Sequence, residues 1–125
     1  MSTSSNKESA VEFLIMCAAG SVREAYEKYV DVRFKHHNAY FKSDRASLME
    51  AMQKSADEEP NKAFRVVQTF VSDDRVAVFS HLQRAQGNTS YAVVHILRFE
   101  NGKVIEMWDV GQEVPQDSPN ELGMF

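Results

Sequence analysis

Apolar residues recur every three to four positions through the first part of the chain, which is the spacing of helices. Ser5-x-x-Glu8 is a capping-box pattern that marks a helix start, and Gly20 is typical of a helix end. Between these signals, one helical face carries the apolar residues Val11, Leu14, Ile15 and Ala18. The pattern therefore predicts a first helix that ends at Gly20.

Two further helices are predicted before the pattern changes. Ser21-x-x-Glu24 is a second capping-box pattern. The apolar stripe that follows it consists of Val22, Ala25, Tyr26 and Tyr29. A third helix is predicted from about Asp44 to a point before Pro60, because proline ends helices. Its apolar positions are Leu48, Ala51 and Met52.

From Phe64 onward the apolar positions alternate with a period of two, which indicates strands. Four strands are predicted, at residues 63–71, 75–84, 90–100 and 103–112. Asn101-Gly102 is typical of a two-residue type I′ hairpin turn. Asp73-Asp74 fits a two-residue turn, and residues 86–88 fit a three-residue loop. We therefore predict one α+β domain over residues 1–125, with three helices packed on one face of an antiparallel sheet.

The predicted turns set which residues lie opposite one another. A two-residue turn at Asn101-Gly102 pairs His95 with Trp108 and makes Glu106 a diagonal neighbour. A three-residue loop at residues 86–88 brings Phe79 to the other side of His95. One face of the sheet is then expected to carry Phe64, Val66, Gln68, Phe70, Ala77, Phe79, His81, Val93, His95, Leu97, Phe99, Glu106 and Trp108. The other is expected to carry Val67, Thr69, Val71, Val76, Val78, Leu82, Ala92, Val94, Ile96, Ile105 and Met107.

These two faces suggest different roles. The first is mainly apolar with a few converging polar groups, which is typical of a small-molecule pocket. We expect the helices to cover this face. The second face is rich in β-branched residues and would remain uncovered. Homodimerisation through that exposed face is the simplest way to bury it.

Charge and composition exclude several other classes of function. The net charge of −4 and the lack of a Lys/Arg cluster argue against a nucleic-acid partner. The longest apolar run contains Glu12 and is too short to span a membrane. No secretory signal begins the sequence, so a cytoplasmic protein is expected. The single cysteine, Cys17, is interpreted as a small buried apolar residue.

Cofactor and metal sites are not expected either. The sequence has no glycine-rich phosphate loop and no catalytic Cys/His or nucleophilic serine motif. Its histidines lack the tight spacing of metal ligands, and adjacent His36 and His37 would point apart on a strand. Of this pair, His36 is expected to face solvent. A cofactor-free pocket for a hydrophobic small molecule is the remaining interpretation.

Several segments together resemble a known family. Residues 91–109, with strand, Glu-Asn-Gly-Lys, strand and Trp-Asp, resemble the last two strands of SnoaL-like polyketide cyclases, in the nuclear transport factor 2-like (ketosteroid-isomerase-like) superfamily. Further matching segments are His37-Asn38, Asp44-Arg45 and residues 73–81 and 114–125. The resemblance implies a cone-shaped α+β barrel with the three helices on the concave face of a curved sheet. It also implies a pocket between them, and commonly a dimer.

The resemblance also implies a chemistry. In these cyclases a carboxylate on the penultimate strand removes a proton next to a carbonyl during an intramolecular aldol closure. His95 stands at the position of that Asp, and Ala39 stands where a proline often follows the His-Asn pair. A neutral imidazole titrates near neutrality, so it can serve as a base in the same place.

Two hypotheses follow. In the first, the protein is a cofactor-free isomerase, cyclase or aldol-type enzyme acting on a hydrophobic carbonyl compound, with His95 as base and Glu106 orienting its ring. The ligand contacts would come from His37, Asn38, Gln68, Phe79, His81 and Trp108. In the second, the same dimeric cone binds an apolar ligand or supports association without turnover. The tail, residues 114–125, is expected to pack either on a neighbouring surface or across the pocket mouth.

Overall fold

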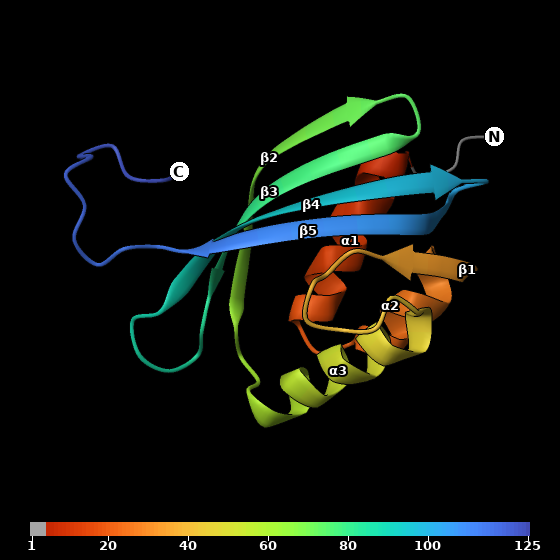
Figure 1. Ribbon diagram of the computed structural model, residues 1–125, viewed down its shortest axis with the longest axis horizontal. Coiled ribbons are helices and arrows are strands. Elements are labelled where there is room, and N and C mark those ends of the chain that lie inside the picture. Colours follow the sequence, from red (N-terminus) through yellow and green to blue (C-terminus); the bar gives the residue numbers. More distant parts are fainter. Residues whose placement is uncertain (1–4) are drawn as a thin grey trace.

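The computed structural model describes residues 5–125 as three helices and one curved five-stranded sheet (Figure 1). In chain order the elements are α1 (Asn6–Ala18), α2 (Val22–Tyr29), β1 (Val30–His36), α3 (Arg45–Glu58), β2 (Ala63–Ser72), β3 (Arg75–Gln83), β4 (Ser90–Glu100) and β5 (Lys103–Glu113). The predicted α+β class is confirmed. The sheet is not closed into a barrel.

The helix starts follow the capping patterns only in part. The capping box before α1 is formed, with the Glu8 amide donating to Ser5 Oγ at 3.1 Å and the Ser5 amide donating to Glu8 Oε1 at 2.9 Å. The second predicted capping box is wrong, because the Ser21 side chain makes no capping bond. The Ser21 amide instead donates to the Met16 carbonyl at 2.9 Å, which ties α2 closely to the end of α1.

The strand order is β1-β5-β4-β3-β2, and β1 runs parallel to β5 while the other pairs are antiparallel. The strand β1 was not predicted from the sequence. Val30, Val32 and Phe34 do alternate, but β1 follows α2 without a turn signal. It lies against the edge of β5 (Figure 1), and it brings the chain from α2 to the segment that contains His37 and Asn38.

The predicted register of β4 is wrong relative to both of its neighbouring strands. The Asn101-Gly102 turn forms as predicted, with both residues at positive φ and Glu100 paired with Lys103. A bulge then lets Phe99 pair with Val104 but Arg98 with Glu106, leaving Ile105 as the extra residue. The connection between β3 and β4 spans residues 84–89, with Gln83 paired with Ser90, instead of the three-residue loop. Each error of one residue exchanges the two faces of a strand.

The helices cover the concave face of the sheet, and the apolar core lies between them (Figure 1). Phe13, Tyr26 and Leu97 are fully buried there. Val76 and Val78 are also fully buried there, although they were predicted to lie on the uncovered face. That assignment is wrong because of the changed register. Within residues 5–125, no helix combines the length and the apolar character needed to cross a membrane.

Candidate functional site

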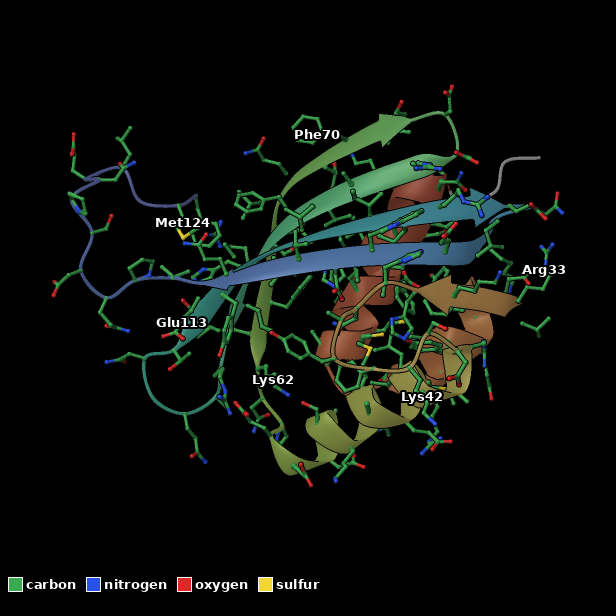
Figure 2. All side chains as sticks on the ribbon, viewed as in Figure 1. Arg33, Lys42, Lys62, Phe70, Glu113 and Met124 are labelled. Carbon is green, nitrogen blue, oxygen red and sulfur yellow. The ribbon has the colours of Figure 1, made fainter. Side chains whose placement is uncertain are left out.

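A cavity of about 180 Å³ lies between α1, α3 and the sheet. Its wall is mostly apolar and consists of Leu14, Cys17, Ala18, Met52, Ser55, Ala56, Lys62, Phe64, Leu82 and His95. Among the residues of this wall, His95 is a polar residue on β4, in the middle of the sheet. Lys62 lies just before β2, on the side of α3 (Figure 2). An apolar cavity with a few polar groups is typical of a small-molecule site.

His95 lies on β4 directly opposite Val78 of β3 and Asp109 of β5. Its Nδ1 atom is enclosed and has no hydrogen-bond partner among the described residues. Burial lowers the pKa of the imidazole below its usual value, and the nearby Asp109 carboxylate opposes this effect only in part. His95 is therefore a neutral imidazole at neutral pH, with a carboxylate available to stabilise its charged form.

Asn38 fixes the carboxylate of Asp109. Its amide Nδ2 donates to Asp109 Oδ1 at 3.0 Å and to Oδ2 at 3.1 Å. The negative charge of Asp109 also raises the pKa of the buried Tyr26, after the larger effect of burial. Because residues that pair directly across antiparallel strands project to the same face, the Asp109 carboxylate lies on the helix-covered side of the sheet, with His95. The structure thus brings together His95, Asp109 and Asn38, of which Asp109 was not predicted.

The segment that carries Asn38 is fastened by a buried histidine. His36 is 2% exposed, so the prediction that it faces solvent is wrong. Its Nε2 lies 2.6 Å from the Lys42 carbonyl oxygen, and its Nδ1 accepts from the Asn38 amide at 3.0 Å. Because the backbone N–H can only donate, Nδ1 is unprotonated and Nε2 carries the proton given to Lys42. His36 therefore positions the residue that holds Asp109.

Glu106 and two predicted ligand contacts form a separate cluster on the outer, convex face of the sheet. His37 stacks on Trp108 with ring centroids 4.9 Å apart, and its Nε2 lies 2.8 Å from Glu106 Oε2. Arg98 donates to Glu106 Oε1 at 2.8 Å. Hydrogen bonds from His37 and Arg98 lower the pKa of Glu106. The predicted pairing of His95 with Trp108 and Glu106 is wrong, because the bulge at Ile105 turns both residues to the opposite face.

The remaining predicted ligand contacts also lie on the outer face. Phe79 and His81 of β3 pack against the tail, with the Phe125 ring centroid 5.5 Å from Phe79 and 4.3 Å from His81. Gln68 lies opposite Phe79 on β2 and is exposed. Of the two expectations for the tail, packing on a neighbouring surface is therefore the one observed.

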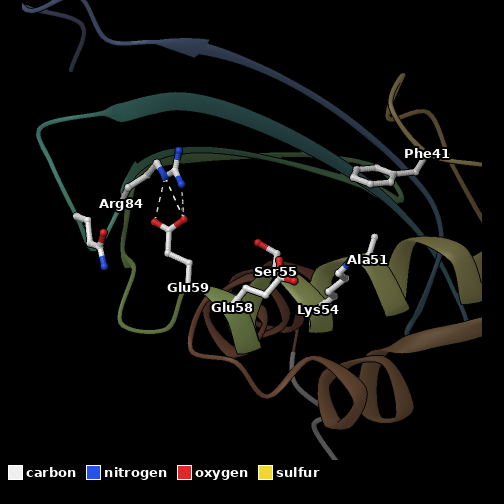
Figure 3. A pocket seen from close by; sticks show the side chains of 8 residues that line it. Phe41, Ala51, Lys54, Ser55, Glu58, Glu59 and Arg84 are labelled. Atoms are coloured by element: carbon white, nitrogen blue, oxygen red, sulfur yellow. Dashed lines mark hydrogen bonds and ion pairs between the residues drawn. The ribbon is translucent and has the colours of Figure 1, made fainter.

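A wider groove runs beside the cavity, between α3 and the end of β3 (Figure 3). Its volume is about 660 Å³ and its lining consists of Phe41, Ala51, Lys54, Ser55, Glu58, Glu59, Arg84 and Gln86. Arg84 and Glu59 form an ion pair at one end of it, with Arg84 Nε 3.0 Å from Glu59 Oε2. Ser55 lines both the groove and the cavity, so the two spaces meet at this residue of α3.

Neither a metal centre nor a reactive thiol is indicated at the cavity. No group of three or more His, Cys, Asp or Glu side chains in residues 5–125 is placed to hold a metal ion. Cys17 is buried as predicted, and burial raises the pKa of its thiol to about 12. The thiol therefore stays protonated near neutral pH and acts as part of the apolar wall.

The family model for the SnoaL-like domain matches residues 13–107. A SnoaL-like polyketide cyclase from Agrobacterium tumefaciens has a TM-score of 0.71 and 13% identity, covering 88% of this chain and 93% of that one. A cystatin-fold protein from Novosphingobium aromaticivorans has a TM-score of 0.72 and 16% identity, covering 86% and 99%. A nuclear transport factor 2-like protein from Cytophaga hutchinsonii has a TM-score of 0.70 and 14% identity, covering 90% and 95%. At these identities the structural likeness establishes the fold. No curated protein matches the sequence.

Proposed function

The chain belongs to the family of SnoaL-like domains, and on that premise we propose that it is a cofactor-free enzyme of the isomerase, cyclase or aldol type. Its ligand is a small hydrophobic carbonyl compound bound in the cavity beside His95. The observation that carries this proposal is a neutral, buried imidazole, His95, that lines an apolar cavity and is paired across the sheet with Asp109.

The proposed reaction begins with proton transfer to the imidazole. His95 takes a proton from the carbon next to the carbonyl, and the electron pair of that C–H bond forms an enolate. Asp109 stabilises the imidazolium that results, as a fixed opposite charge favours the charged form of a base. Return of the proton to a different carbon gives an isomer. Attack of the enolate on a second carbonyl forms a C–C bond and an alkoxide, and the His95 imidazolium returns its proton to that alkoxide to give the aldol product. Neither outcome requires an oxidant or a metal.

Deuterium exchange tests the proton transfer without knowledge of the natural substrate. Small ketones are incubated with the protein in D₂O, and NMR follows loss of the protons next to the carbonyl. We expect exchange faster than in buffer that contains the same concentration of free imidazole. Ligand binding at His95 without faster exchange would instead favour the non-catalytic binding hypothesis. Absence of both would contradict the proposal.

We also propose that the outer face of the sheet pairs with a second copy of the chain. Phe70 and Val110 on this face are 63% and 70% exposed, and Figure 2 shows Phe70 pointing away from the helices. The half-buried Trp108 extends the same apolar surface. The packing of Phe125 against Phe79 supports the proposal, because it indicates that the face accepts apolar side chains.

Sedimentation of two charge variants tests this interface. Val110→Lys puts a charge on the apolar face and should weaken the dimer by at least about tenfold, since an unpaired charge at an interface is costly. Val32→Lys is the matched control, because Val32 is 85% exposed but lies on the edge strand β1. A monomeric wild-type protein, or equal effects of the two variants, would contradict the proposal.

A further inference from the structure

One residue that lines the cavity, Lys62, is positively charged, although most of the cavity wall is apolar. Lys62 lines the cavity together with residues such as Phe64 and Leu82. Its Nζ donates to the Ser55 hydroxyl at 3.1 Å and to the Ser55 carbonyl at 3.3 Å. These two acceptors leave one of the three ammonium protons without a partner. The Lys62 side chain is therefore anchored beside the cavity with donor capacity to spare.

The acidic groups near Lys62 do not neutralise it. Within residues 5–125 no carboxylate lies within ion-pair distance of Nζ, since the nearby Glu59 is engaged by Arg84 at 3.0 and 3.2 Å (Figure 3). That engagement lowers the pKa of Glu59, with a smaller effect from Lys62. Glu59 is thus engaged by Arg84, and the Lys62 ammonium is left open to a ligand.

The volume of the cavity limits the apolar part of that ligand. A cavity of roughly 150 Å³ with apolar walls accepts one benzene molecule. The present cavity, of about 180 Å³, therefore holds one six-membered ring or a short acyl chain of similar size. Any larger part of a ligand has to extend past Ser55 into the wider groove, whose lining is mostly polar and charged.

From these two observations we propose that the ligand is a small keto acid, with a single ring or short chain in the cavity and a carboxylate on Lys62. His95 then faces the carbon next to the ketone from the sheet side. This inference rests on the proposed function for the location of the site. It adds that the substrate carries a negative charge and that its apolar part is no larger than one ring or a short chain.

Three probes test the charge and the size separately: phenylacetate, its neutral analogue 2-phenylethanol and the larger 1-naphthylacetate. The dissociation constants come from NMR titrations that follow the ring resonances of His95. We expect phenylacetate to bind about tenfold more tightly than 2-phenylethanol, which lacks the carboxylate, since tenfold corresponds to about 1.4 kcal/mol from one charge-assisted hydrogen bond. Phenylacetate should also bind more tightly than 1-naphthylacetate, because the second ring of that probe exceeds the volume of the cavity. Lys62→Gln should weaken phenylacetate binding by about tenfold and leave 2-phenylethanol unchanged.

Two further variants control for structural damage. Lys62→Arg keeps the positive charge and should retain most of the affinity for phenylacetate. Lys54→Gln removes an exposed lysine that lines only the wider groove, and it should change neither dissociation constant. Equal binding of phenylacetate and 2-phenylethanol would overturn the charge, and equal binding of 1-naphthylacetate would overturn the size, while both would leave the proposed site intact. If no probe moved the His95 resonances, the site itself would be wrong.

Discussion

Replacing His95 by glutamine is expected to slow deuterium exchange into a bound ketone by about 10²–10⁴-fold, which is the usual contribution of a positioned base. Glutamine keeps a polar side chain of similar length but cannot accept the proton. The matched control is His81→Gln, because His81 lies on the outer face beneath Phe125 and does not line the cavity. Equal loss of exchange in both variants would remove His95 from the proposed mechanism.

A second pair of variants asks which carboxylate assists His95. Asp109→Asn removes the charge that stabilises the imidazolium and should slow exchange by about 10- to 100-fold, equivalent to roughly 1.4–2.8 kcal/mol of barrier. Glu106→Gln should leave the rate close to that of the wild-type protein, since Glu106 is bound to His37 and Arg98 on the other face. The opposite ranking would restore the pairing predicted from sequence and would contradict the observed register.

The elements of this fold could be predicted from local signals, because those signals are strong. The capping box at Ser5 and the Asn101-Gly102 turn involve residues two to three positions apart, and both form as predicted. The strand β1 could not be predicted as easily. It follows α2 without a break, and its pairing with β5 joins residues about seventy positions apart, such as Lys35 and Glu106.

The site was harder to predict than the fold because it depends on the register of the strands. His95 and Asn38 were chosen from their residue types and positions, and both lie at the site. Glu106 was chosen because it would neighbour His95 across an ideal hairpin. The bulge at Ile105 shifts the register of β5 by one residue, so that Asp109 lies opposite His95 instead. The acidic residue that follows Trp108 was visible in the sequence, but nothing local indicates a bulge at Ile105.

Burial of His95 has a consequence for stability as well as for catalysis. Its pKa in the folded protein is lowered, mainly by burial, while in the unfolded chain it returns to about 6.5. Below that pH the unfolded chain binds a proton that the folded protein resists. The free energy of unfolding therefore decreases as the pH falls below about 6.5. Above that pH, His95 is neutral in both states and this loss of stability is absent.

Urea unfolding of the wild-type protein and His95→Gln between about pH 4.5 and 6.5 measures this effect. The wild-type protein should lose up to about 1.4 kcal/mol of stability per pH unit from this one proton, and the variant should show a flatter dependence. The carboxylates with lowered pKa, such as Glu106, contribute mainly below this window, because their usual value is 4.5. The comparison uses slopes, so a uniform loss of stability in the variant does not affect it. Parallel slopes would mean that the pKa of His95 is not lowered in the folded protein, which would contradict its burial as a neutral imidazole.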